Sequence, residues 1–424
     1  MPTRYTHLSS RAAAAASASM LFLTANAFAA STQPAGKNAY PALTAAAKEL
    51  RDEAKIGIAV KRSHDTEKEA DDRPYTMDEI TQLVAENQTA IDQTRKAMQL
   101  PYSFPLTGTS IATKNEYPAK FRTIARLFAL DAKVKAGSES YAAAMDSALD
   151  AIALGELTQS HTTYFGGVMG ASSVVIGERA AWEIIPKLSV AESAAAARRL
   201  EQIIAKHPPF NETMANERIV ARNSIPVFLN AKDPVAMLGD TGYEFVGNES
   251  DALKRGIAEL RRAGPAAALA DVDAAASKTA HLNAGLWKVP SDDAAPVGRY
   301  GVTRFLFSLN VPRIRFTIIN GEAENRLLLT MLAIHAYEGD HGQLPDNLKQ
   351  LAPAYIKAVP ADVFAAGESL KYGIAGGKAI VYSIGPDGID DSGDAIDNPG
   401  TKTDEARRTP AMDSTGDIVA GVNM

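Results

Sequence analysis

Apolar side chains recur at three- and four-residue intervals through most of residues 41–280, and this spacing is typical of amphipathic α-helices. The clearest stripe contains Phe121, Ile124, Leu127 and Phe128, and Gly137 closes it. The same pattern predicts helices over about 41–60, 76–98, 117–137, 140–157, 162–185 and 189–206, and another after Asn211. One or two alanine-rich helices, broken at Gly264-Pro265, are predicted over 251–280.

Short turns join most of these predicted helices, which therefore resemble stacked antiparallel hairpins. Capping boxes at Thr76–Glu79 and Ser189–Glu192 mark two helix starts, and the small residues of 166–173 predict a close helix contact. No strict repeat period is present. The predicted fold class is mainly α, a helical hairpin stack or irregular α-solenoid over residues 30–300.

The pattern changes in residues 301–424, for which we predict a small α+β module. A long apolar helix is predicted over about 315–338, and a short helix capped by Asp346 is predicted after it. Two strands follow over 370–374 and 378–384, with the turn doublet Gly376-Gly377 between them. Residues 395–415 are polar and are predicted to form a mobile acidic loop, after which Gly416–Ala420 could add an edge strand.

The first 29 residues have the composition of a signal peptide. Arg4 and Arg11 precede an apolar run, and Ala27-Phe-Ala29 fits the small-residue cleavage rule. An uncleaved membrane anchor is the alternative, but the run is short and alanine-rich. We therefore expect a periplasmic or secreted protein that has no membrane span after cleavage.

Composition narrows the possible functions. The net charge of −6 becomes −8 once Arg4 and Arg11 are removed, and an acidic chain is a poor nucleic-acid binder. The absence of cysteine excludes disulfides, thiolate metal sites and cysteine nucleophiles. A search for His-Glu-x-x-His, Gly-x-Ser-x-Gly, Walker and dinucleotide motifs finds none in a suitable context. Six histidines lie after the predicted signal peptide, and they are scattered along the chain. His335 is predicted to be a hydrogen-bonded core residue.

An acidic turn follows the second predicted strand and is the main candidate site. Four aspartates lie within eight residues of a glycine-rich turn: Asp387, Asp390, Asp391 and Asp394. Calcium prefers six to eight oxygen ligands at about 2.3–2.6 Å, and such a turn supplies carboxylates on short side chains. The spacing is not that of an EF-hand. A solvated acidic turn is the alternative interpretation.

Residues 326–420 resemble the soluble head of the major pseudopilins of bacterial type II secretion. The likeness rests on the long helix leading into 337–345, on Val381-Tyr-Ser-Ile-Gly-Pro-Asp-Gly388, and on Gly416-Asp-Ile418. It implies a helix packed on a small antiparallel sheet with a calcium loop. The implied calcium ligands are the Ile384 carbonyl and the side chains of Asp387 and Asp417, with Asp390, Asp391 and Asp394 as alternates.

Two features depart from that family. The helix here is internal and is preceded by charged residues, so it cannot be processed and assembled as a pilin, and the loop before Asp417 is longer. Residues 115–230 also resemble the helical half of uncharacterised exported bacterial proteins that carry such a head.

We therefore expect an exported, non-enzymatic binding or scaffold protein with a protein or peptide partner. An accessory component of a type II secretion or pilus-like system is one alternative. An envelope hydrolase with an unrecognised site is another.

Overall fold

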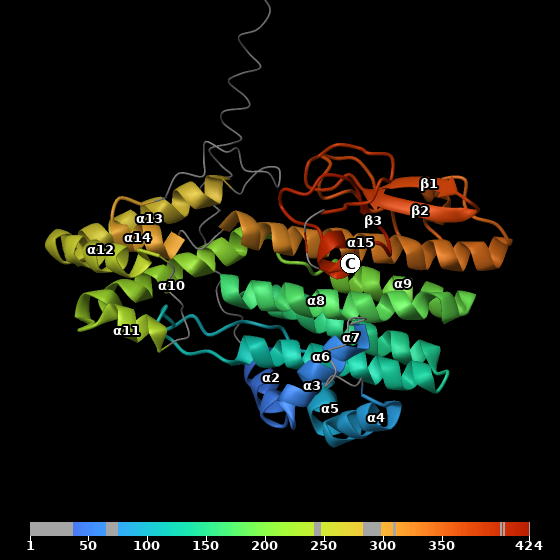
Figure 1. Ribbon diagram of the computed structural model, residues 1–424, viewed down its shortest axis with the longest axis horizontal. Coiled ribbons are helices and arrows are strands. Elements are labelled where there is room, and N and C mark those ends of the chain that lie inside the picture. Colours follow the sequence, from blue (N-terminus) through green and yellow to red (C-terminus); the bar gives the residue numbers. More distant parts are fainter. Residues whose placement is uncertain are drawn as a thin grey trace, which may run out of the picture.

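The computed structural model describes residues 37–64, 75–240, 247–282, 298–307, 311–398, 401 and 403–423 (Figure 1). The predicted signal peptide lies outside these residues. None of the helices in the described ranges is long and apolar enough to cross a membrane.

The chain is mainly helical and has a small three-stranded antiparallel sheet near its C-terminus, which confirms the coarse fold prediction. The N-terminal helices are α2 (Ala39–Lys48), α3 (Glu53–His64), α4 (Met77–Glu86), α5 (Gln88–Ala97), α6 (Tyr117–Gly137), α7 (Tyr141–Gln159), α8 (Tyr164–Ile184), η1 (Ile185–Lys187), α9 (Val190–Ile204) and α10 (Phe210–Asn230). The later elements are α11 (Pro234–Gly239), α12 (Glu249–Ala263), α13 (Pro265–Leu282), α14 (Gly301–Phe307), α15 (Val311–His341), η3 (Leu348–Leu351), β1 (Lys371–Ala375), β2 (Lys378–Ser383), α16 (Asp404–Arg408) and β3 (Ile418–Val419).

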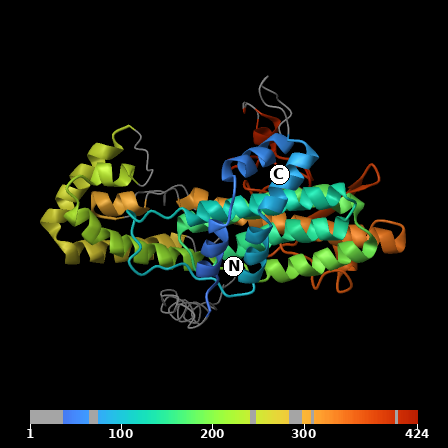
Figure 2. The same cartoon turned by 90° about the horizontal axis from the view of Figure 1, so that it is seen from below.

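The middle of the molecule is a bundle in which α7 packs on α6 and α8, and α15 packs on α8 and α9. Helices α2–α5 cover one side of this bundle, and α10–α14 form an arm that projects from one end (Figures 1 and 2). The two predicted capping boxes are present and open α4 and α9. One hydrophobic cluster joins buried residues of α7–α9 to those of α15 and the sheet, so the two predicted regions share a core.

Glycines set the short distance between α7 and α8. A Cβ added to Gly155 would lie 2.6 Å from the carbonyl oxygen of Gly170, and one added to Gly177 would lie 2.7 Å from that of Ala148. Real Cβ atoms do not approach backbone so closely, so these positions require glycine. The close helix contact predicted from the small residues is confirmed.

The sheet packs on α15 and carries the acidic turn. Strand β1 pairs with β2 in the register Lys371 with Tyr382, and β2 pairs with β3 through Ser383 and Ile418. The Gly376-Gly377 turn has positive φ at both residues, as the hairpin prediction requires. His335 of α15 contacts Ser193 through Nδ1 and Oγ at 2.9 Å, which confirms its predicted hydrogen-bonded role.

Three local predictions were wrong. The helix predicted over 41–60 is divided between α2 and α3, because Asp52 has a left-handed φ of 52°. The helix predicted over 76–98 is divided at Asn87, whose buried side chain hydrogen-bonds the backbone of Arg51. The 3-10 helix η3 is capped by Asn347, which accepts from Lys349 N, and not by Asp346.

The segment 395–415 also contains more structure than the irregular loop that was predicted. It includes α16, and Asn398 N donates to Arg407 O at 2.8 Å. Asn423 Nδ2 donates to the carbonyls of Ile396 and Arg408, each at 2.9 Å. The local sequence pattern did not predict this order, because it depends on Asn423, a buried residue outside the segment, which donates hydrogen bonds to the backbone of the segment.

Candidate functional site

The acidic turn is held together by its own aspartates. Asp417 Oδ2 accepts from Gly393 N at 2.7 Å and its Oδ1 accepts from Asp391 N at 3.3 Å. Asp387 accepts from Ile389 N at 3.0 Å and from Gly416 N at 3.3 Å. The turn at residues 387–394 and the segment around Asp417, which the resemblance places together, are therefore adjacent in space.

The other predicted ligands lie around these two. Asp390 accepts from Tyr382 Oη and Ser392 N, and its carboxylate lies 3.5 Å from Lys371 Nζ. The Asp394 carbonyl accepts from Asp417 N. Ile384 directly follows β2, and its N–H donates to the buried carboxylate of Asp362 at 2.9 Å.

Asp417 is fully buried, and its ionisation is correspondingly opposed. Burial raises the pKa of Asp417 to about 6; the carboxylates of Asp390 and Asp391 add to this, while the N–H groups of Gly393 and Asp391 oppose it. Within the described ranges, no three Asp, Glu or His side chains are positioned to hold a metal ion. The turn as it stands is closed by backbone hydrogen bonds to carboxylates.

A second group of acids, which the sequence reading missed, lies inside the bundle. Glu178 of α8 is fully buried and Glu324 of α15 is 5% exposed. Neither Glu178 oxygen has a hydrogen-bond partner among the described donors, and the nearby carboxylates are those of Glu324 and Glu156. Burial and then the Glu324 charge raise the pKa of Glu178 well above its usual value, and burial raises the pKa of Glu324 to about 7. This pair is most stable when one carboxyl carries a proton.

Glu156 of α7 joins this group to the surface. It accepts from Asn325 Nδ2 at 2.8 Å and contacts His207 Nδ1 at 2.7 Å. Burial opposes the charged imidazole, but the hydrogen bond and charge of Glu156 outweigh it and raise the pKa of His207. A hollow of about 230 Å³ borders Glu156, and its polar lining also includes Tyr102, Ser160, His161 and Lys206.

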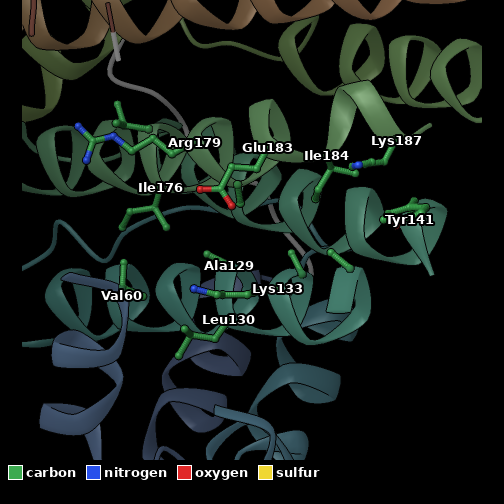
Figure 3. A pocket seen from close by; sticks show the side chains of 14 residues that line it. Val60, Ala129, Leu130, Lys133, Tyr141, Ile176, Arg179, Glu183, Ile184 and Lys187 are labelled. Carbon is green, nitrogen blue, oxygen red and sulfur yellow. The ribbon is translucent and has the colours of Figure 1, made fainter. Parts of the chain in front are cut away.

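A groove with a volume of about 290 Å³ lies between α6 and α8 (Figure 3). We call it the α6/α8 groove. Val60 of α3 lies at one end, and Tyr141 lies at the other (Figure 3). Its aliphatic lining residues are Val60, Ala129, Leu130, Ala132, Ala136, Val175, Ile176, Ala180 and Ile184.

The charged lining residues of the groove are mostly basic. Lys133 comes from α6, Arg179 and Glu183 from α8, and Lys187 from η1 (Figure 3). Three cations against one carboxylate give the rim a positive balance. An aliphatic floor with a cationic rim suits a small molecule that is mostly apolar and carries negative charge.

The sequence contains a signal for the buried acids but not for the groove. Glu178 is the single acid in the stretch 164–182, where Arg179 is the one other charged residue, and an acid in so apolar a helix is expected to be buried and to need a special environment. The groove gave no comparable signal, because its residues come from helices that are separated in the chain.

No protein-family model, curated protein sequence or solved structure matches this chain.

Proposed function

We propose that the protein is an exported, non-enzymatic binding protein whose α6/α8 groove takes a small, largely apolar molecule. The observation that carries this proposal is the groove itself, in which aliphatic side chains of three helices form a concave surface of about 290 Å³. Small-molecule sites are concave, predominantly apolar and bordered by a few polar groups. The volume lies near the lower end of their usual range, which favours a compact ligand over a folded partner.

The bundle provides a rigid frame for such a site. Leu130 is 1% exposed and Ala132 is also buried, so the floor belongs to the packed core of α6. Val60 reaches the groove from α3, which packs on α6. Because the walls are packed helices and not loops, the free protein is already shaped for its ligand, and little ordering cost opposes binding.

A ten-carbon amphiphile titrated into the protein tests the proposal. We expect decanoate and 1-decanol to bind, with decanoate favoured by the basic rim, in isothermal titration calorimetry. Ala180→Phe places a large side chain in the groove and should weaken binding by about ten-fold or more, or about 1.4 kcal/mol.

The control is Ala195→Phe, because Ala195 is exposed on α9 away from the groove. Binding that survives Ala180→Phe unchanged would contradict the proposal. Binding of an apolar peptide in place of either amphiphile would assign the groove to a peptide partner.

We also propose that the acidic turn takes a calcium ion. The likeness to the pseudopilin head supports this site, and the ion would replace the backbone N–H groups from which Asp387 and Asp417 now accept hydrogen bonds. Calcium should raise the melting temperature of the full chain by mass action. Asp387→Asn with Asp417→Asn should abolish that shift, whereas Asp346→Asn, outside the turn, should keep it; an unchanged melting curve with calcium or chelator would refute the site.

A further inference from the structure

Two arginines of α6, Arg122 and Arg126, lie next to each other without an acidic partner among the described residues. Arg122 and Arg126 are both partly buried, and the Arg122 Nε atom is buried without a hydrogen-bond partner. Arg126 lies against Gly57 of α3: a Cβ atom added to Gly57 would be 3.5 Å from Arg126 Nη1. In the ranges that the structure describes, neither guanidinium forms an ion pair or a side-chain hydrogen bond.

This arrangement costs free energy in the absence of an anion. Burial lowers the pKa of Arg126, and the neighbouring positive charge of Arg122 lowers it further. Arg95 of the same bundle is instead neutralised, because it lies 2.7 Å from Asp150 and 3.0 Å from Asp131. Two adjacent, partly desolvated guanidinium groups are stable together mainly when an anion lies between them.

The pair continues the α6/α8 groove. Residues 122, 126, 129 and 133 repeat at three- and four-residue spacing, so Arg122 and Arg126 share a face of α6 with the groove residues Ala129 and Lys133. On α3, Gly57 lies beside Arg126, about one turn before Val60, which lines the groove. Arg126 therefore lies about 5 Å along the helix from the nearest groove residue of α6.

We infer that Arg122 and Arg126 form an anion site for a phosphate or carboxylate group. The anion site is inferred from the positions of the two arginines alone. We also infer that the anionic group belongs to the molecule whose apolar part occupies the α6/α8 groove, and this link rests on the proposed function. Guanidinium groups bind both oxyanions through paired N–H donors, so phosphate and carboxylate share the recognition chemistry.

Thermal unfolding of the full chain in a buffer free of polyvalent anions tests the site. Inorganic phosphate should raise the melting temperature of the wild type. Arg126→Gln should abolish this phosphate-dependent rise and should also raise the melting temperature without phosphate, because it removes the repulsion. Arg198→Gln, which changes an exposed arginine of α9, should leave both values unchanged.

Calorimetry with three amphiphile probes separates the two proposals. If the inference is right, Arg126→Gln weakens decanoate and decyl phosphate by about ten-fold and leaves 1-decanol unaffected. Loss of all three probes in Ala180→Phe, with the phosphate effect retained, would support the groove and the anion site separately. Equal weakening of 1-decanol and decanoate by Arg126→Gln would overturn the link between them.

Two further results would overturn the anion site. One is a phosphate-dependent rise that survives in Arg126→Gln. The other involves the acidic residues Asp65, Glu67, Glu69, Asp71 and Asp72, which lie outside the described residues. If phosphate stabilises the protein only after these are changed to amides, the arginine pair serves an internal carboxylate and not a ligand.

Discussion

At the scale of single residues, the unusual feature is the set of charges inside the helical bundle. Glu178 of α8 and Glu324 of α15 interact through their carboxyl groups, and the charge of Arg179 only partly offsets the rise in their pKa values. Glu156 is different, because Asn325 and His207 satisfy both of its oxygens. The first pair needs a shared proton, whereas Glu156 favours a protonated histidine.

These groups predict that the protein loses stability as the pH rises. The pKa of Glu324 is about 7 in the folded protein and 4.5 ordinarily, so the folded state holds the proton more tightly and stability falls between these values. His207 acts in the same direction. Its raised pKa gives a contribution that is complete below its ordinary pKa of 6.5 and is lost as the pH passes the folded value.

The variant Glu324→Gln tests this pH dependence. It should raise the melting temperature by a few degrees at about pH 8, where Glu324 has lost its proton in the wild type, and change it little at about pH 5, where Glu324 holds it. Glu338→Gln, on the exposed side of the same helix, serves as the control. An equal effect of Glu324→Gln at both pH values would show that the glutamates do not share a proton.

At the scale of elements, the bundle depends on how closely α7 and α8 approach. Gly177→Ala adds one methyl group at 2.7 Å from backbone atoms of α7, so the helices must separate. We expect a loss of about 1–3 kcal/mol in the free energy of unfolding, partly offset by the better helix propensity of alanine. Chemical denaturation measures this change.

Gly321→Ala is the matched control in α15, since a Cβ there meets no atom within 4 Å. It should be neutral or stabilising by up to about 1 kcal/mol. If both substitutions had the same effect, helix propensity and not the interhelical distance would determine the stability of the bundle.

Many of the helices, strands and turns could be predicted from the sequence. The apolar stripe of α6, the Ser189 capping box and the Gly376-Gly377 hairpin depend on residues close together in the chain, and all were predicted correctly. The break at Asn87 was not, because the Asn87 side chain satisfies the backbone of Arg51, 36 residues away. The buried glutamates and the groove likewise depend on which helices pack together, and local periodicity does not determine that.

At the scale of the whole molecule, α15 joins the two predicted regions. It packs against α8 and α9 on one side and against β2 on the other. The sheet and its acidic turn are therefore attached to the bundle through a helix that also carries Glu324. The α6/α8 groove lies within the same bundle, with the Arg122 and Arg126 pair beside its Val60 end.

The most direct test of the groove as the ligand site is a crystal structure of the full chain with a terminally brominated decanoate, recorded at the bromine absorption edge. We expect an anomalous peak between α6 and α8, with the carboxylate toward Arg126 and the bromine toward Tyr141. A bound molecule located elsewhere, with the α6/α8 groove empty, would contradict it.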